Sequence, residues 1–253
     1  MRLRLFLSSL RFSLRSSLAF AAFAAVAVII VNPRAFAQDI FVTPVPNAPF
    51  SGVIHVERSI IRPNGSVINL KTSRVICRDS QGRIRNEMHA LIPVSVAANP
   101  PLIRVLLYDP ETRLSTFLNV QRRTYRTMSV SHPPQAVPPR LLQASPAASA
   151  MPSNDFTKEE DLGYQEIEGL QAHGVRDTQI IPAEKSSTGK EIVITDEYWY
   201  SDELRINLMI KHSDPRTGAV VMKVAQINRV DPDPSLLTIP EGYKPVSAVR
   251  AKK

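Results

Sequence analysis

Alternation of apolar and polar residues recurs along most of this chain and predicts β-strands. In the clearest segment every second residue is apolar: Leu204, Ile206, Leu208 and Ile210. A period of two places these side chains on one face of a strand, so we expect a strand with one buried face. Strand-like segments at residues 192–200 and 219–230 lie on either side, separated from it by turn-forming residues. Together the three segments predict an antiparallel meander.

The first half of the chain repeats this pattern. Residues 53–61 and 67–77 flank Pro63-Asn64-Gly65, and Asn-Gly is a strong hairpin signal because both residues tolerate positive φ. Further strands are expected at residues 83–89, 102–108 and 114–120. Strong amphipathic helices are nearly absent, and we expect one helical turn around residues 156–161. The predicted fold class is therefore mainly β, an antiparallel sheet with few short helices.

Proline content divides the chain. Six prolines lie between residues 131 and 155 among Ser, Ala and Gln, which is the composition of a linker or a long loop. The expected organisation is a signal peptide at residues 1–37, an extended lead-in at 38–50, a first β half at 51–130, the proline-rich segment at 131–155, a second β half at 156–245 and a C-terminal tail at 246–253. We expect both halves to contribute to one sheet.

Residues 1–37 have the features of an export signal. Four arginines precede an apolar run at residues 18–31, and Ala35-Phe36-Ala37 then gives the small-x-small pattern that signal peptidase reads. We therefore expect cleavage before Gln38 and export to the periplasm or the extracellular space. The run is shorter than the roughly 20 residues that span a bilayer, and no later stretch is long enough, so no transmembrane anchor is expected after cleavage.

Removal of this segment changes the charge of the chain. The full sequence has a formal net charge of +8, but five of its 31 Lys and Arg lie in residues 1–37, which leaves 26 basic against 23 acidic residues. A net charge of about +3 weakens the case for a nucleic-acid partner. The remaining excess of basic residues lies in residues 38–150. It predicts either an ordinary solvated surface or one that faces anionic lipid or polysaccharide.

The sequence lacks the motifs of catalysis and metal binding. None of its five histidines has a partner at helical metal-ligand spacing, and no nucleophile elbow or phosphate-binding glycine loop is present. His212 with Asp214 and Asp202 is the nearest approach to a site, and turn formation explains Asp214 better. Cys77 is the single cysteine, so no intramolecular disulfide is expected, and it is interpreted as a small buried residue. We predict a protein without catalytic residues, metal or cofactor.

Two groups of arginines adjoin predicted strands. The first group surrounds one hairpin and the second follows another strand: Arg74, Arg78, Arg83 and Arg85, then Arg122, Arg123 and Arg126. Charged side chains commonly protect the exposed parts of a sheet, and this is the simpler interpretation. The alternative is a surface for a lipid headgroup or another polyanion.

The densest aromatic cluster is Tyr198, Trp199 and Tyr200. On a strand, Trp199 faces one side and the two tyrosines face the other. The cluster is either a core anchor with rim contacts or an apolar wall for an acyl chain or peptide, since binding pockets are lined mainly by such groups. The alternating row would form the floor of the same cavity. The candidate ligand-binding residues are Tyr198, Trp199, Tyr200, Leu204, Ile206, Leu208 and Ile210.

Several segments of the second half resemble a known superfamily. They are residues 197–201 (Glu-Tyr-Trp-Tyr-Ser), 211–218, 233–244, and upstream Tyr164, 167–169 and 174–176. These segments resemble exported bacterial proteins of the outer-membrane lipoprotein carrier superfamily, and residues 78–83 resemble uncharacterised secreted bacterial proteins of the same type. The resemblance covers roughly residues 50–130 and 160–245. It implies a curved antiparallel sheet that forms a half-open barrel with an apolar concave face.

These observations lead to two hypotheses of function. In the first, an exported non-enzymatic protein holds an apolar ligand, a lipid or a lipidated protein, on the concave face of the half-barrel. In the second, the protein is a sensor or structural adaptor of the cell envelope that binds another protein or a polysaccharide. No nucleic-acid partner is expected in either case.

Overall fold

The computed structural model describes residues 39–130 and 156–246. The chain divides into two units, Met1–Pro33 and Arg34–Lys253, and every described residue belongs to the second. The predicted signal peptide, the proline-rich segment at 131–155 and all but the first residue of the predicted tail lie outside the described residues.

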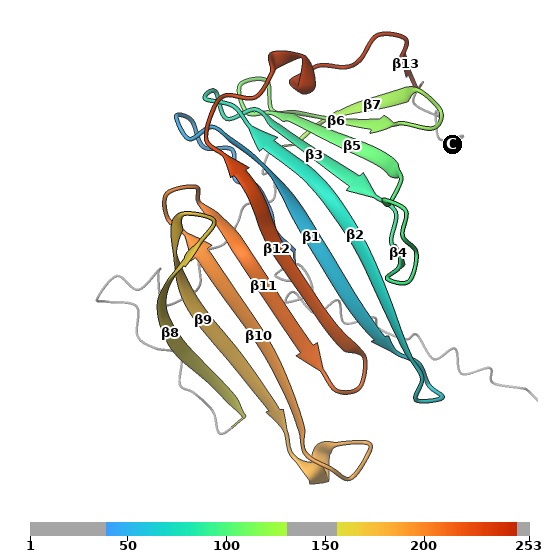
Figure 1. Cartoon of the computed structure of the whole chain (residues 1–253), viewed down its shortest axis with the longest axis vertical. Helices are drawn as coiled ribbons and strands as arrows, with labels where there is room; N and C mark the ends of the chain where they lie inside the picture. The colour runs from blue at the N-terminus through green and yellow to red at the C-terminus, as the bar shows by residue number, and fades with distance from the viewer. Residues whose placement is uncertain (1–38, 131–155, 247–253) are drawn as a thin grey trace, which may run out of the picture. The chain divides into compact units, whose positions relative to one another are not determined.

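The described residues form one open, curved sheet of thirteen strands (Figure 1). The strands are β1 (Phe50–Ile61), β2 (Val67–Arg78), β3 (Ile84–His89), β4 (Ile92–Pro93), β5 (Leu102–Asp109), β6 (Leu114–Asn119), β7 (Thr124–Ser129), β8 (Thr157–Ile167), β9 (Leu170–Ile181), β10 (Ile192–Ser201), β11 (Ile206–Asp214), β12 (Gly218–Asn228) and β13 (Lys244–Pro245). Their order across the sheet is β13-β7-β6-β5-β3-β2-β1-β12-β11-β10-β9-β8, and β4 pairs with β2. The prediction of a mainly β, curved antiparallel sheet is confirmed.

Helical structure is scarce in this part of the chain. The segments η3 (Ala183–Lys185) and η4 (Pro234–Leu237) are single 3-10 turns. None of the helices among the described residues has the length and apolar character that crossing a membrane requires.

The predicted halves meet in the middle of the sheet. β1 pairs with β2 on one side and with β12 on the other, so that Ile54 lies opposite Arg74 and Val224. Strands β1–β7 of the first half therefore continue directly into β12–β8 of the second half, as Figure 1 shows. This confirms that both halves contribute to one sheet.

The hairpins with strong turn signals form as predicted. β1 and β2 are joined by a tight turn in which the backbone N–H of Arg62 donates to the carbonyl of Ser66 over 2.9 Å. Gly65 adopts φ of 79°, a conformation that other residues rarely take. The predicted meander is present as β10, β11 and β12.

Three strands of six or more residues differ from the expectation, and β9 is one that the sequence pattern missed. The helical turn expected around residues 156–161 is wrong, because residues 157–167 form β8, the edge strand that pairs with β9. β8 is exposed along most of its length, so its sequence lacks the apolar alternation of a half-buried strand. β7 was also missed, since four of its six residues are exposed and its composition is mostly polar.

One face of the sheet carries most of the core. We call face A the side on which Ile54 lies, and face B the opposite side; residues opposite one another in antiparallel strands point to the same side. The buried apolar side chains that register places on face A are Phe50, Ile54, Val56, Ile76, Ile84, Tyr108, Val175, Ile192, Ile194, Ile210, Val220, Met222 and Val224.

The chain before β1 packs against face A. We call residues 39–49 the lead-in segment; it contributes Ile40, 0% exposed, and Val42, 6% exposed, to the main core. Arg78, which is fully buried, donates hydrogen bonds to the carbonyls of Thr43 (2.6 Å) and Ala48 (2.8 Å). The segment is therefore part of the folded domain.

A second, smaller core lies on face B at the other end of the sheet. It consists of Val105, Leu107 and Leu118, with Tyr125 and Tyr243 packed against it. The C-terminal segment that contains η4 runs along this face, where Arg85 donates to the carbonyl of Leu236 over 2.9 Å. The sheet is thus covered on face A near β1 and β2, and on face B over β3 and β5–β7.

Candidate functional site

Six of the seven predicted ligand-binding residues are buried. Their exposed fractions are 8% for Trp199, 4% for Tyr200, 2% for Leu204, 0% for Ile206, 0% for Leu208 and 1% for Ile210. Tyr198 is half-buried and packs against the same main core, which contains all but Tyr200 of these six. Five of the seven residues thus belong to one packed core, Tyr198 packs against it and Tyr200 is not a member; contact of any of them with a ligand stays a prediction.

The alternating row of β11 is interrupted. Trp199 lies opposite Met209, but the next residue, Tyr200, lies opposite Asn207, so that Leu208 is an extra residue on β11. Such a bulge shifts the alternation of side chains between the faces. Asn207 is consequently buried, at 5% exposed, although the pattern predicted a solvent-facing position. Leu204 lies in the preceding turn, where Arg205 adopts φ of 53°.

Trp199 lies on face B as a structural anchor. Its ring covers Gly174 of β9, where a Cβ atom would lie 2.6 Å from two ring carbons. Its Nε1 donates to Glu197 over 2.8 Å, and Glu197 also accepts from Lys211 (2.7 Å) and Arg176 (3.1 Å). Burial raises the pKa of Glu197, but these three hydrogen bonds outweigh it and hold the pKa below its ordinary value.

Face A carries an apolar row in strict register across five strands. Val56, Met222, Ile210, Tyr198 and Val175 lie opposite one another from β1 to β9. Four of these five side chains are buried and Tyr198 is half-buried. Of the predicted ligand-binding residues, this row contains Tyr198 and Ile210.

A hollow of about 320 Å³ lies beside β9 and the β10–β11 turn. We call it the acidic hollow; its lining residues are Tyr164, Gly169, Gln171, His173, Tyr200, Asp202 and Glu203. Tyr200 is the predicted ligand-binding residue that lines it. Burial raises the pKa of the Tyr200 hydroxyl above its ordinary value.

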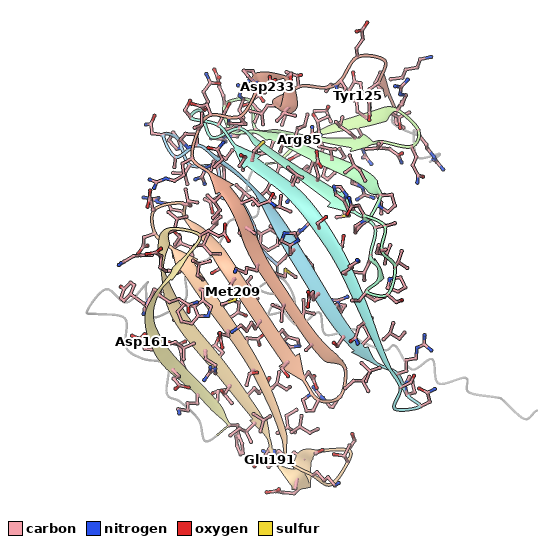
Figure 2. The ribbon with its side chains drawn as sticks, in the orientation of Figure 1. Arg85, Tyr125, Asp161, Glu191, Met209 and Asp233 are labelled. Carbon is pink, nitrogen blue, oxygen red and sulfur yellow. The ribbon has the colours of Figure 1, made fainter. Side chains whose placement is uncertain are left out.

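His173 is the most constrained side chain of the acidic hollow. Its Nε2 lies 2.8 Å from Oδ1 of Asp161, and its ring stacks on Tyr164 with centroids 4.7 Å apart. Figure 2 shows Asp161 on the outer strand β8. Hydrogen bonds from the backbone of Gly163 and from His173 hold the pKa of Asp161 below its ordinary value. No sequence signal linked these residues, because the β8–β9 register alone places Tyr164 beside His173.

A second hollow, of about 400 Å³, lies over β5, β6 and β7. We call it the arginine hollow; its lining residues are Arg104, Phe117, Leu118, Asn119, Arg122, Thr124, Tyr125, Arg126, Met128 and Val246. The sequence pattern identified Arg122 and Arg126 as members of an arginine group. It missed Arg104 and Phe117, which line the same hollow because β5, β6 and β7 are paired.

The first arginine group is not an exposed surface. Arg78 is 0% exposed and Arg74 is 9% exposed, so the expectation of solvent-facing side chains is wrong for both. The lead-in segment covers them, and its Asp39 forms an ion pair with Arg74. Burial lowers the pKa of the Arg78 guanidinium to about 10, which still leaves it charged at neutral pH.

The histidine, aspartate and cysteine candidates have structural partners. Nδ1 of His212 lies 2.7 Å from Asp196, whereas Asp214 accepts from Arg216 over 2.7 Å. Within residues 39–130 and 156–246, no three His, Cys, Asp or Glu side chains are grouped so as to hold a metal ion. Cys77 is buried, as predicted, and burial raises the pKa of its thiol to about 11, so it is protonated at neutral pH.

Comparisons with known proteins found solved structures that are similar to this chain at low sequence identity. No family model matches the chain, and no curated protein matches it. MucB of Pseudomonas aeruginosa, solved in complex with MucA, is 13% identical with a TM-score of 0.35; the match covers 81% of this chain and 57% of that one. This chain therefore spans less than two thirds of the length of the MucB chain.

Two further solved structures are covered more fully. A LolA superfamily protein from Nitrosomonas europaea is 10% identical with a TM-score of 0.29, and the match covers 81% of this chain and 94% of that one. The lipoprotein LppX of Mycobacterium tuberculosis is 13% identical with a TM-score of 0.26, with 70% of this chain and 86% of that one covered. This chain is similar to each of these two structures at low sequence identity and low TM-score.

Proposed function

We propose that this protein is a non-enzymatic binding protein that holds an apolar ligand, a lipid or a lipidated protein, against face A. The apolar row from Val56 to Val175 carries the proposal. It supplies one uninterrupted apolar strip across five strands of an open sheet. Burial of a ligand's methylene groups on such a strip is favourable by about 0.8 kcal/mol per group.

The cover that the lead-in segment provides supports this proposal. It contains no regular secondary structure and places two apolar side chains, Ile40 and Val42, in the main core. Its polar attachments include the bonds to Arg74 and Arg78 near one end of β2 and the hydrogen bond from the backbone N–H of Asn47 to the carbonyl of Ser80 (2.8 Å). A segment of this kind is exchanged for a ligand more readily than a packed helix, because fewer buried contacts oppose its release.

Gentle purification of the full chain followed by native mass spectrometry tests the proposal. The expected result is an additional mass of a bound lipid or lipidated polypeptide that is lost on extraction with organic solvent. A protein that emerges without ligand, and that binds no fluorescent sixteen-carbon fatty acid in solution, contradicts the proposal.

Two variants of neighbouring residues on β12 locate the ligand. Met222 lies in the apolar row on face A, whereas Val221 lies on face B and is 39% exposed. Met222→Gln keeps the length of the side chain and is expected to weaken binding of the fatty acid at least fivefold, while Val221→Gln leaves it within twofold. Equal effects of the two variants, with both folded by circular dichroism, would place the ligand elsewhere.

A patch beside β4 favours the adaptor as a second candidate function. Leu91, Val94 and Val96 are 41%, 48% and 39% exposed and lie close together along the chain. Exposed apolar patches commonly mark protein contacts. Crosslinking in cell envelopes, repeated with Val94→Asp, distinguishes the candidates: one reproducible protein partner that is lost in the variant supports the adaptor, and its absence contradicts it.

A further inference from the structure

The arginine hollow lies on face A, at the end of the sheet formed by β5, β6 and β7. Register places Arg104 opposite Asn119, and Phe117 opposite Arg126. Arg104 and Arg126 therefore stand on the two strands that flank β6, with Phe117 and Asn119 between them. Figure 2 shows Tyr125, the neighbour of Arg126, at this end of the sheet.

The third arginine reaches the hollow from a turn. Arg122 lies between β6 and β7, and its backbone N–H donates to Oδ1 of Asn119 over 2.9 Å. The next residue, Arg123, adopts φ of 48°, which fixes the shape of this turn. Lys244 of β13 pairs with Thr124 directly beside it. The three arginines thus come from β5, from β7 and from the turn between β6 and β7, which strand pairing holds together.

No carboxylate of residues 39–130 or 156–246 lines this hollow. Among the described residues, Arg74, Arg83, Arg85, Arg176, Arg216 and Arg229 each form an ion pair with an Asp or Glu. The three arginines of the hollow form none within that part of the chain. Grouped guanidinium groups without a counter-charge repel one another, and a bound anion relieves that repulsion.

The hollow also offers apolar contacts beside the arginines. Phe117 is half-buried, Met128 is 39% exposed and Val246 is 51% exposed. A small inorganic anion would leave these side chains in water, whereas an amphiphilic anion would cover them. Three arginines suit a phosphate group, since a guanidinium matches two phosphate oxygens with two parallel N–H bonds.

We infer that the arginine hollow binds the phosphate of an anionic phospholipid headgroup, with the first methylene groups of the lipid against Phe117 and Met128. This site lies at a different part of the sheet from the apolar row and does not depend on the proposed function. It would attach the protein to an anionic lipid surface or select an anionic lipid, even if the apolar row holds no ligand.

Vesicle sedimentation with the full chain tests the inference. Vesicles of phosphatidylcholine alone are compared with vesicles that contain phosphatidylglycerol, at low and at physiological salt. Binding is expected with phosphatidylglycerol only, and added salt is expected to weaken it, because guanidinium–phosphate attraction is screened. Absence of binding to the anionic vesicles overturns the inference.

Two double variants with the same change in charge distinguish binding at the arginine hollow from non-specific electrostatic attraction. The double variant Arg104→Gln with Arg126→Gln is expected to weaken vesicle binding at least tenfold. The control, Arg58→Gln with Arg62→Gln, removes the same charge from exposed positions at the far end of β1 and its turn, and is expected to stay within twofold. Equal losses in the two double variants would show non-specific attraction and overturn the site.

Inorganic phosphate distinguishes the source of the anion. Calorimetric titration with phosphate is expected to show weak binding that the Arg104→Gln, Arg126→Gln variant loses, and phosphate is expected to displace the protein from vesicles. Phosphate binding of this kind without vesicle binding assigns the hollow to a free phosphate and overturns the lipid assignment. Fatty-acid binding measured on the same variant is expected to be unchanged, so a failure of this site and a failure of the proposed function give different results.

Discussion

At the scale of single residues, a hydrogen bond to a charged side chain fixes the position of Trp199 in the aromatic cluster. Trp199 is held on face B by its hydrogen bond to Glu197 and by the space that Gly174 leaves for its ring. The sequence predicted that Trp199 and the tyrosines face opposite sides, since alternation along a strand requires it. It did not predict the partners, because Arg176 and Lys211 reach Glu197 only through the pairing of β9 and β11 with β10.

Glu197 is predicted to make stability depend on pH. Its pKa in the folded protein lies below the ordinary value of 4.5, so its contribution is fully present above that pH and is lost as the pH falls through the folded pKa. Glu197→Gln is expected to lower the free energy of unfolding by about 2 kcal/mol at pH 7. The difference between wild type and variant should shrink at pH 3. Urea denaturation at both pH values measures it.

The control for this prediction is Glu57→Gln, because Glu57 is an exposed residue of β1. Its effect on the free energy of unfolding should stay within about 0.5 kcal/mol at either pH. A difference between Glu197→Gln and wild type that is the same at pH 7 and pH 3 would contradict the proposed role of the ionised carboxylate.

At the scale of elements, the sequence identified strands that are buried on one side. β1, β2, β10, β11 and β12 carry the apolar core and have clear turn signals between them. The strands β7, β8 and β9 were missed. β7 is mostly polar and β8 is an edge strand, so the place of both in the sheet is set by their neighbours and not by their own periodicity. The bulge at Leu208 could not be predicted from the sequence pattern, because a bulge exists only relative to the partner strand, here β10.

Arg78 is predicted to hold the lead-in segment on the sheet. Its guanidinium donates to the carbonyls of Thr43, Ala48 and Leu204, and its side chain is fully buried. Arg78→Met would leave these carbonyls without that donor, and it is expected to lower the free energy of unfolding by about 3 kcal/mol. Limited proteolysis should then cleave the lead-in segment faster than in wild type.

Arg83 provides the matched control. It follows the same β2–β3 turn, but its side chain is one-third exposed and its charged partner is the nearby Asp79. Arg83→Met is expected to cost less than Arg78→Met, because Asp79 keeps its hydrogen bonds from the backbone N–H groups of Gln81 and Arg83, and to leave the proteolysis of the lead-in segment unchanged. Similar proteolysis of the two variants would show that Arg78 does not hold this segment.

At the scale of the whole described molecule, the pairing of β1 with β12 joins two halves that are distant in sequence. We call the β1–β12 pairing the seam. Periodicity and turns predicted strands on each side of it, and the superfamily resemblance predicted that these strands form one curved sheet. Neither predicted how the faces are covered. The lead-in segment covers face A, and the segment around η4 covers face B; both contacts depend on side chains whose partners lie 30 or more residues away.

Gly218 is predicted to be essential for that seam. It lies opposite Ile60 with φ of 116°, and a Cβ atom there would lie 1.9 Å from the carbonyl oxygen of Ser59. Gly218→Ala is therefore expected to lower the free energy of unfolding by about 3 kcal/mol, through backbone strain and displacement of β1 from β12. Gly189→Ala is the control, because Gly189 also has positive φ but no atom within 4 Å of the added Cβ.

Hydrogen exchange distinguishes a shared seam from a local defect. If β1 and β12 unite the halves, Gly218→Ala should accelerate exchange in β2 of the first half as well as in β11 of the second, because both lose a correctly placed neighbour. Faster exchange confined to β11 and β12 would contradict this and show that the first half is stable by itself. Gly189→Ala should accelerate exchange only near its own turn, since no strand of the seam contacts it.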